Sequence, residues 1–370
     1  MATKVFHLTS VHPVFDTRIF HKQCVSLAEA GYDVTLLASG CEEQYLNGVK
    51  IRSVLKEKNR VARMLKTPWN LYRKIVKSNA EICHFHDPEL IPVGVLLRLH
   101  GKKVIYDVHE DYPGSILDKF WLPFLLRKPA SLITACVEWI GSRFFFTGII
   151  VVTSTIAKRF PVQKTILVQN LPKLQELLPP QNKEYKKRIA QLAYIGGLAE
   201  IRSIIEIMQA MSTLSHNECR LILAGRFSNI ETEKKCRQHN GWEKVEYKGW
   251  VSRRDVASLL SDVRAGLVLF HPLPNHVAAQ PNKLFEYMSA GIPVIASDFP
   301  LWRKIIDGAQ CGLLVDPLQP KSIAEAIDWL LDHPEEAEQM GKNGRKAVVE
   351  RYNWETESKK LLDVYSKLNI

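Results

Sequence analysis

Residues Phe270–Asp298, FHPLPNHVAAQPNKLFEYMSAGIPVIASD, combine a strand end, a polar loop, a helix and a second strand. A buried strand over Ala265–Phe270 ends at the proline-rich letters HPLP, which disfavour a helix. Pro281 then starts a helix with apolar residues at helical spacing, and Gly291 ends it. This order predicts a βαβ unit of a parallel sheet, with the loop at the carboxyl end of its first strand.

Lys283 and Glu286 lie in the first turns of this helix, three residues apart and on neighbouring turns of one face. Ligands of open parallel sheets bind at the carboxyl ends of the strands, where a helix N-terminus attracts anions. The lysine could therefore meet a phosphate, while the carboxylate could hold sugar hydroxyls. From these residues alone, a surface ion pair between the two is the simpler interpretation.

The letters PNKLFEYMSAGIPVIASD, residues 281–298, resemble the donor-binding signature of retaining GT-B glycosyltransferases of glycosyltransferase family 4. The resemblance implies that Glu286 binds the ribose of a nucleotide-sugar and that the preceding backbone helps to hold its diphosphate. A second family glutamate, which touches the donor sugar, is replaced here by Ala278, so the choice of donor sugar stays open. The donor-binding residues expected in this segment are Asn282, Lys283, Leu284 and Glu286.

Composition predicts an ordinary two-domain globular chain. It has 370 residues, of which 46% are hydrophobic and 24% charged. Seven cysteines without a C-x-x-C pair disfavour a zinc site or a disulfide framework and indicate a reducing compartment. The first residues lack a signal-peptide pattern, and charges interrupt the most apolar region, Ala130–Val152. We therefore expect a cytoplasmic protein without a membrane span.

The net charge of +11 suggests an anionic partner. No helix shows a basic stripe with interleaved aromatic residues, so we expect no nucleic-acid partner. The segment Ser115–Lys128, SILDKFWLPFLLRK, is amphipathic. This pattern suits contact with an anionic membrane surface, including Phe120, Trp121 and Phe124, and equally suits a helix buried against its domain. A peripheral position at the inner face of the cytoplasmic membrane is the corresponding hypothesis.

The first half of the chain alternates strands and helices, and its loops at the strand ends carry the candidate acceptor residues. Here HPVFDTRIFHK takes the place of the family's glycine-rich loop and resembles a bacterial subset of that family. The resemblance implies acceptor binding by His12, Asp16 and Arg18. Asp16 could equally be an N-cap of the helix that begins near Arg18. The expected strands are Val5–Leu8, Asp33–Ala38, Val49–Val54, Ile82–His86 and Lys103–Val108.

His109 directly follows one of these strands, and a neutral imidazole there could donate to the donor sugar or the diphosphate, as the resemblance also implies. His84 and His86 share one face of their strand. They supply only two close metal ligands, which favours a structural role over a metal site. Asp87 precedes Pro88 and is expected to be the N-cap of the next helix.

In the second half, the strand Leu192–Ile195 leads into Gly196 and Gly197, which permit close backbone approach to a phosphate. The letters YIGGLAEIRS resemble the family's phosphate clamp. Gly197 stands where the family has arginine, Arg202 where it has lysine, and Arg226 is the candidate for the missing charge. The segment GWVSRRDV resembles the loop that frames the nucleotide base, which implies a base contact by Val251, while Ser252 is a natural N-cap.

We therefore predict an α/β protein of the GT-B type with two Rossmann-like, doubly wound parallel-sheet domains that face a central cleft. The expected boundaries are 1–171 for the acceptor domain, 172–188 for a linker, 189–352 for the nucleotide-sugar domain and 353–370 for a helix that crosses back to the first domain.

The resemblance implies a retaining, metal-independent hexosyltransferase that moves a sugar from a nucleoside diphosphate donor. A UDP-sugar is favoured over a GDP-sugar, and the acceptor is a glycan or a lipid-linked molecule of bacterial cell-surface polysaccharide synthesis. Neither a cofactor nor a metal is expected, since helix dipoles and cationic side chains can stabilise the departing diphosphate. A GT-B sugar-nucleotide epimerase and a non-catalytic binding protein remain alternatives. The expected catalytic residues are His109, Arg202, Lys283 and Glu286.

Overall fold

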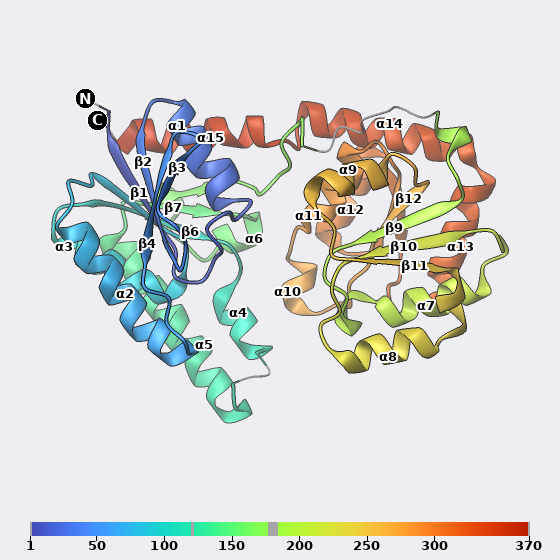
Figure 1. Ribbon diagram of the computed structural model, residues 1–370, viewed down its shortest axis with the longest axis horizontal. Helices are drawn as coiled ribbons and strands as arrows, with labels where there is room; N and C mark the ends of the chain where they lie inside the picture. The colour runs from blue at the N-terminus through green and yellow to red at the C-terminus, as the bar shows by residue number, and fades with distance from the viewer. Residues whose placement is uncertain (1, 120–121, 177–183, 369–370) are drawn as a thin grey trace. The chain divides into compact units, whose positions relative to one another are not determined.

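The computed structural model describes residues 2–119, 122–176 and 184–368, apart from the side chain of Arg254. These residues form two compact units (Figure 1). The first contains the chain up to Asn170 together with the segment from Thr356 onward, and the second contains Leu171–Glu355. The described parts of the expected linker, 172–176 and 184–188, thus belong to the second unit.

The first unit is built on an eight-stranded sheet of order β3-β4-β2-β1-β5-β6-β7-β8. All neighbouring strands are parallel except β3 and β4. The antiparallel edge strand β3 was not among the expected strands. The strands are β1 (Lys4–Leu8), β2 (Asp33–Ser39), β3 (Gln44–Leu46), β4 (Val49–Val54), β5 (Ile82–Phe85), β6 (Lys103–Val108), β7 (Gly148–Val151) and β8 (Thr165–Leu167).

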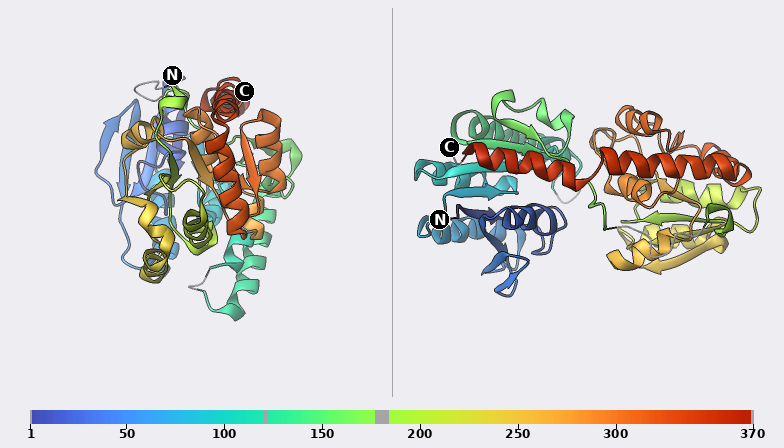
Figure 2. Two further views of the ribbon diagram at one scale, coloured as in Figure 1. Left: turned by 90° about the vertical axis from the view of Figure 1, so that its right-hand side faces the viewer. Right: turned by 90° about the horizontal axis from the view of Figure 1, so that it is seen from above.

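Helices cover both faces of this sheet (Figure 2). The connections from β4 through β7 all move along the sheet in one direction, so right-handed crossovers place α2, α3 and α5 on one face. The connection from β1 to β2 runs the other way and places η1 and α1 on the opposite face. The helical segments are η1 (Ile19–Cys24), α1 (Val25–Glu29), α2 (Arg60–Val76), η2 (Pro88–Leu90), α3 (Ile91–Leu99), α4 (Tyr112–Leu117), α5 (Phe124–Ile140), η3 (Gly141–Phe145), α6 (Ser154–Ala157), η4 (Val162–Lys164) and α15 (Trp354–Leu368).

The expected amphipathic segment Ser115–Lys128 is not one helix. It spans the end of α4 and the start of α5, because Pro123 stands at the N-cap of α5. Phe120 and Trp121, two of the aromatic residues in that prediction, lie outside the described residues. Among the described residues, no helix combines the length and the apolar character that a bilayer crossing needs.

The second unit contains a six-stranded sheet of order β11-β10-β9-β12-β13-β14, with every neighbouring pair parallel. Its strands are β9 (Gln191–Ile195), β10 (Arg220–Ala224), β11 (Val245–Gly249), β12 (Ala265–Val268), β13 (Val294–Ser297) and β14 (Gly312–Val315). Its helical segments are η5 (Tyr185–Lys187), η6 (Glu200–Arg202), α7 (Ile204–Thr213), α8 (Ile230–Gln238), η7 (Asn240–Lys244), α9 (Arg253–Leu260), α10 (Pro274–Val277), α11 (Asn282–Ser289), α12 (Pro300–Ala309), α13 (Pro320–Asp332) and α14 (Pro334–Glu350).

The predicted βαβ unit is present as β12, α11 and β13, and Gly291 follows α11 with a φ of 68°. One local expectation is wrong, since the short helix α10 begins at Pro274, within the segment that was expected to exclude a helix. Pro274 lies in its first turn, where its missing N–H has no helical partner to lose.

A close contact holds α11 against the sheet. A Cβ atom on Gly266 would lie 2.2 Å from Cδ2 of Tyr287, so only glycine lets α11 approach β12 this closely. The Tyr287 hydroxyl accepts a hydrogen bond of 3.0 Å from the backbone N–H of Ile195, at the end of β9. The second half of α11 is thereby fixed against β12 and the carboxyl end of β9.

Candidate functional site

The carboxyl edge of the first sheet carries a cluster of four imidazoles, His7, His84, His86 and His109, which we call the histidine cluster. His7 Nδ1 lies 3.0 Å from His86 Nε2, and His86 Nδ1 lies 3.1 Å from His109 Nε2. Burial lowers the pKa values of His7, His84 and His86 well below the usual value, so these rings are neutral at physiological pH.

Asp107, near the end of β6, is the charged centre of this region. Its carboxylate is buried and accepts two hydrogen bonds from the Arg18 guanidinium, of 2.8 and 3.0 Å, and one of 2.7 Å from Gln23 Nε2. His109 Nε2 lies 3.2 Å from Oδ2 of the same carboxylate. Burial alone would raise the pKa of Asp107, but Arg18 and His109 hold it well below its usual value.

The side chain of Arg18, one of the expected acceptor-binding residues, is 3% exposed and forms a buried ion pair with Asp107. Only Nη1 remains without a hydrogen-bond partner among the described residues. A role for Arg18 in acceptor binding would have to act through that one atom.

The structure places His12 next to His109, with ring centroids 4.8 Å apart. Asp16 Oδ1 accepts hydrogen bonds from the backbone N–H groups of Arg18 and Ile19, at 2.8 and 2.9 Å, so this side chain binds the start of η1, whose N-cap position is Arg18. Its other oxygen, Oδ2, lies 3.8 Å from His12 Nδ1.

Asp87 stands at the N-cap position before Pro88, as expected, but its side chain does not cap that helix. Instead Oδ2 accepts hydrogen bonds from the Thr9 hydroxyl at 2.9 Å and from the Ser10 backbone N–H at 2.6 Å. Oδ1 lies 3.3 Å from His12 Nε2. Asp87 therefore organises the loop after β1, a role that sequence spacing could not show because the two segments lie 77 residues apart.

Sequence reasoning also missed His7, Asp107 and Tyr365. Parallel pairing sets His7 opposite His84, and Asp107 lies on the strand next to β5. The Tyr365 hydroxyl, from α15, lies 2.7 Å from His84 Nδ1 and 3.3 Å from His7 Nε2. The sequence did contain one signal for these residues, because polar residues recur at the ends of three apolar strands. These polar residues gather at one edge of the sheet only if the three strands are neighbours, which the sequence does not show.

Two sets of side chains have the spacing of metal ligands, His7 with His84 and His86, and His86 with Asp107 and His109. The second set supplies two imidazoles and a carboxylate. However, Oδ2 of Asp107 already accepts hydrogen bonds from Arg18 and Gln23, and the adjacent guanidinium would repel a metal ion. The set of His86, Asp107 and His109 therefore suits the ion pair between Asp107 and Arg18 better than a metal centre.

The second unit carries two cations, Arg202 and Lys283, around the carboxyl edge of its sheet. Lys283 Nζ lies 3.6 Å from the ring centroid of Tyr194 and 5.1 Å from that of Phe270, and the Arg202 guanidinium lies 5.3 Å from the Phe270 centroid. Lys283 is 7% exposed, and its amine has no hydrogen-bond partner among the described residues. Burial, together with Arg202, lowers the pKa of Lys283 well below its usual value.

A buried amine next to a second cation is unfavourable unless an anion completes the site. The first turn of α11 adds backbone N–H groups and the positive end of the helix dipole, and Pro281 at its N-cap supplies no side-chain cap. Arg202, Lys283 and this helix N-terminus therefore form an arrangement that suits a phosphate or a diphosphate.

Glu286 does not form the surface ion pair with Lys283 that the simpler interpretation predicted. Its Oε1 accepts a hydrogen bond of 2.6 Å from Arg253 Nη1, at the start of α9. The same guanidinium donates two hydrogen bonds, of 2.9 and 2.6 Å, to Glu176 Oε1. Arg253 thus joins α9 to α11 and holds the Glu286 carboxylate in place.

We expect Glu286→Ala to weaken nucleoside diphosphate binding about tenfold, since a charge-assisted hydrogen bond contributes at least roughly 1.5 kcal/mol. Isothermal titration calorimetry measures this affinity. Glu176→Ala is the matched control, because it also removes a carboxylate partner of Arg253 but leaves α11 unchanged. Equal losses in the two variants would show that the arginine network, and not a ribose contact, explains the effect.

The glycine loop after β9 bends toward Arg202. Gly196 has a φ of 124°, and Arg202 Nη1 donates a hydrogen bond of 3.3 Å to the Gly197 carbonyl. A Cβ atom on residue 197 would lie 3.0 Å from Nη1 of Arg202. Glycine at this position, where the family has arginine, therefore leaves room for the guanidinium of Arg202. Arg226 is exposed after β10, and its backbone carbonyl accepts a hydrogen bond from Leu198 N–H.

Val251 is partly exposed just before α9 and packs against the apolar core of the second unit. Ser252 is confirmed as the N-cap of α9, where it forms a capping box with Asp255. No contact of the described residues assigns a base to Val251, so that role stays a prediction.

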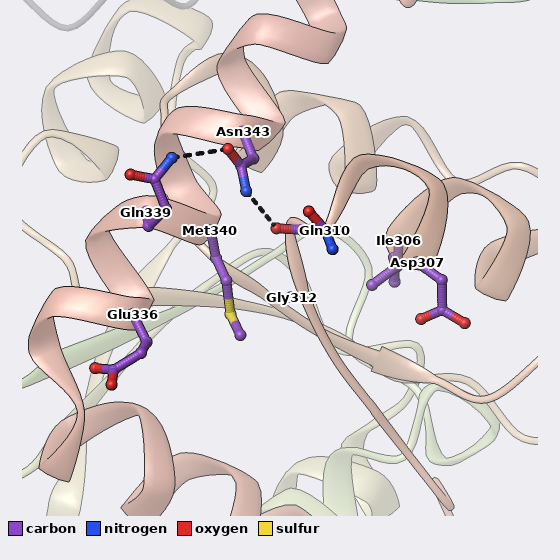
Figure 3. A pocket seen from close by; sticks show the side chains of 8 residues that line it. All are labelled: Ile306, Asp307, Gln310, Gly312, Glu336, Gln339, Met340 and Asn343. Atoms are coloured by element: carbon purple, nitrogen blue, oxygen red, sulfur yellow. Dashed lines mark hydrogen bonds between the residues drawn. The ribbon is translucent and has the colours of Figure 1, made fainter.

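A pocket in the second unit lies away from these residues (Figure 3). It is lined by α12, α14 and Gly312, the first residue of β14, and therefore adjoins the amino end of that strand. Asn343 Nδ2 donates a hydrogen bond of 3.1 Å to the Gln310 carbonyl and Gln339 Nε2 donates one of 2.9 Å to Asn343 Oδ1. The pocket contains none of the cations that would hold a diphosphate.

Comparison with known proteins finds a different family model for each half of the chain. A family model described as "Glycosyltransferase Family 4" matches residues 17–161, and one described as "Glycosyl transferases group 1" matches residues 176–347. The alpha-D-kanosaminyltransferase of Streptomyces kanamyceticus is 23% identical over 180 residues, which cover 48% of this chain and 45% of that protein. The chain spans about half the length of the curated relatives it matches.

Two solved structures show the same fold over nearly the whole chain. Sucrose-phosphate synthase from Thermosynechococcus elongatus has a TM-score of 0.77 and 18% identity, and the match covers 99% of each chain. Anabaena HepE in complex with UDP has a TM-score of 0.74 and 12% identity, covering 99% of this chain and 100% of the other. The protein has the GT-B fold, which confirms the predicted fold class.

Proposed function

We propose that this protein is a glycosyltransferase that transfers a sugar from a nucleoside diphosphate donor. The observation that carries the proposal is the buried amine of Lys283, which has no hydrogen-bond partner among the described residues and lies near Arg202 in the first turn of α11. Such a site lacks only an anion. A UDP-sugar is the favoured donor, since the structurally similar HepE binds UDP.

Each candidate residue has a distinct part in the proposed reaction. Arg202 and Lys283 neutralise the charge that develops on the departing diphosphate, with Arg226 as a further cation. Asn282 supplies a backbone N–H group of α11, and Leu284, whose own N–H donates to the Pro281 carbonyl, lies in the same first turn. Glu286 holds the ribose. Gly196 and Gly197 let the backbone approach the phosphates, and Val251 contacts the base.

In the first unit, His109 is proposed to form a hydrogen bond with the transferred sugar. Asp107 accepts a hydrogen bond from Nε2–H, so Nδ1 of the neutral ring is the atom that would accept one from a sugar hydroxyl. His12 and Asp16 border the same edge and are proposed to contact the acceptor. We propose transfer of a hexose with retention of configuration and without a metal ion, because the acceptor can attack on the face that the diphosphate leaves.

The proposed acceptor is a glycan or a lipid-linked molecule of bacterial cell-surface polysaccharide synthesis. Support comes from the surplus of basic residues and from the exposed apolar helices of the first unit. Such an acceptor would bring the enzyme to the inner face of the cytoplasmic membrane as a peripheral protein.

A screen of nucleotide-sugars tests the proposed reaction, with release of the nucleoside diphosphate as the readout. We expect one donor class to be turned over, and His109→Ala to lower turnover about tenfold while nucleoside diphosphate affinity stays unchanged, as loss of one hydrogen bond predicts. His100→Ala, an exposed histidine of the same unit, is the matched control.

Equal turnover in His109→Ala and wild type would remove His109 from the reaction. A new sugar nucleotide formed from donor alone would indicate the epimerase instead. Failure of every nucleotide-sugar and nucleoside diphosphate to bind would overturn the proposed function itself.

A further inference from the structure

Exposed large apolar side chains concentrate on two segments of the first unit. Of those recorded among the described residues, eight lie on Phe124–Phe145, which comprises α5 and η3, and four lie on α2. On α5–η3 they are Phe124, Leu125, Leu126, Leu132, Ile133, Trp139, Ile140 and Phe144, and on α2 they are Val61, Met64, Leu65 and Trp69. We call these two segments together the docking face.

The two segments lie on the same side of the sheet. The direction of the crossovers places α2, α3 and α5 on one face, and α3 packs against both α2 and η3 (Figure 1). The outward residue Leu99 of α3 is 67% exposed and continues the apolar character between them.

The inner side of α5 is fixed, so its outer side must face away from the domain. Glu138 is buried and accepts hydrogen bonds from the Tyr106 hydroxyl at 2.8 Å and from Arg159 Nη2 at 2.5 Å. Leu132 and Trp139 are 65% and 49% exposed, and by helical spacing they lie about 120° and about 100° around the helix axis from Glu138. Turning α5 to bury these two side chains would move Glu138 away from Tyr106 and Arg159.

The charges on the docking face have one sign. The sequence of α2 contains five basic residues and no acidic one, and exposed Lys128 and Arg143 flank the apolar residues of α5–η3. Glu138, the one acidic residue of Phe124–Phe145, is turned inward and paired. A large apolar surface bordered by positive charge and carrying two exposed tryptophans matches the chemistry of an anionic bilayer surface.

We infer that α2 and Phe124–Phe145 form a docking face for an anionic membrane surface. Apolar side chains of α5–η3 and α2 enter the boundary between headgroups and acyl chains, and the flanking basic residues contact anionic headgroups. This inference deepens the proposed function, because a lipid-linked acceptor would be presented at such a surface. It also moves the membrane contact from Ser115–Lys128 to the length of α5 and to α2.

Vesicle flotation tests the inference with the full chain. Wild type is expected to float with vesicles of phosphatidylcholine and phosphatidylglycerol at low salt and to detach as the salt concentration is raised. It is not expected to float with vesicles of phosphatidylcholine alone. The triple variant Leu132→Ser, Ile133→Ser, Trp139→Ser is expected to lower the partition coefficient at least roughly tenfold. The charge variant Lys66→Glu, Lys128→Glu should lower it by about the same factor or more.

Trp250→Ser with Val349→Ser is the matched control, since both side chains are exposed apolar residues of the second unit. The charge variant changes only exposed lysines, so it decides the question if the triple variant fails to fold. The inference is overturned if wild type does not float, if the control lowers partition as much as the triple variant, or if the charge variant floats like wild type. A wild-type dimer that the triple variant converts to a monomer, measured by light scattering, would overturn it in favour of a second copy of this chain.

Calorimetry with UDP on the same proteins separates this inference from the proposed enzymatic function. Wild type and the docking-face variants are expected to bind UDP equally, because the docking face lies in the first unit and the cations lie in the second. Wild type that floats but binds no nucleoside diphosphate would refute the proposed function and leave the docking face intact. Wild type that binds UDP but does not float with anionic vesicles would refute the docking face and leave the proposed function intact.

Discussion

Replacing Asp107 with alanine is expected to lower the free energy of unfolding by about 3–5 kcal/mol, the cost of leaving one member of a buried ion pair without its partner. Arg18 is 3% exposed, and its guanidinium would lose both hydrogen bonds to the carboxylate. Gln23 would lose its acceptor as well. Urea denaturation measures the change in stability.

The matched control is Lys50→Ala, which breaks an ion pair to Asp33 of 2.7 Å in which the lysine is 47% exposed. This exposed pair should contribute less than about 1 kcal/mol. A double variant, Arg18→Met with Asp107→Leu, should be less destabilised than Asp107→Ala, because it leaves no unpaired charge. Equal denaturation midpoints for Asp107→Ala and Lys50→Ala would contradict the role of Asp107 as the charged centre of the first site.

Replacing Lys283 with methionine is expected to have two opposite effects. Nucleoside diphosphate affinity should fall by roughly ten to a hundredfold or more, since a hydrogen bond to a charged group contributes about 1.5–3 kcal/mol. Stability without ligand should rise, because within the part of the chain that the structure describes the buried amine has no hydrogen-bond partner, and it lies near a second cation. Calorimetry measures the affinity, and urea denaturation measures the stability.

The lowered pKa of Lys283 adds a pH dependence whose sign can be worked out. Between this lowered pKa and the ordinary lysine value, the unfolded chain binds a proton that the folded chain does not, so this residue makes stability rise with pH through that window. A bound diphosphate raises the pKa again. Nucleotide binding should therefore take up protons within the window, and affinity should fall as pH rises.

Calorimetry in two buffers of different ionisation enthalpy counts the protons taken up. Wild type should take up protons at mildly alkaline pH, and Lys283→Met should take up fewer. Lys321→Met, which replaces an 88% exposed lysine of the same unit, should behave like wild type. Proton uptake that is identical in wild type and Lys283→Met would show that the diphosphate does not contact this amine.

The sequence by itself determined the fold class and several elements of both units, but not the edge strand β3 or the short helix α10. Apolar runs and helical spacing located the βαβ unit of β12, α11 and β13, since these signals are local and each needs only its own segment. The N-cap at Ser252 was predictable for the same reason. The resemblance of residues 281–298 to a donor-binding signature indicated the GT-B fold that the structural comparisons confirm.

Only the tertiary structure decided which side chains meet. Asp107 pairs with Arg18 across 89 residues, and Glu286 is held by Arg253 across 33 residues. These contacts depend on strand order, register and the packing of helices on the sheet, none of which appears in the periodicity of any single segment. The burial of Lys283 has the same origin, because Tyr194 and Phe270, whose rings surround its amine, come from the ends of two neighbouring strands. Local sequence signals determined the type of most of the segments that they predicted, and long-range packing determined which charges are buried, paired or left for a ligand.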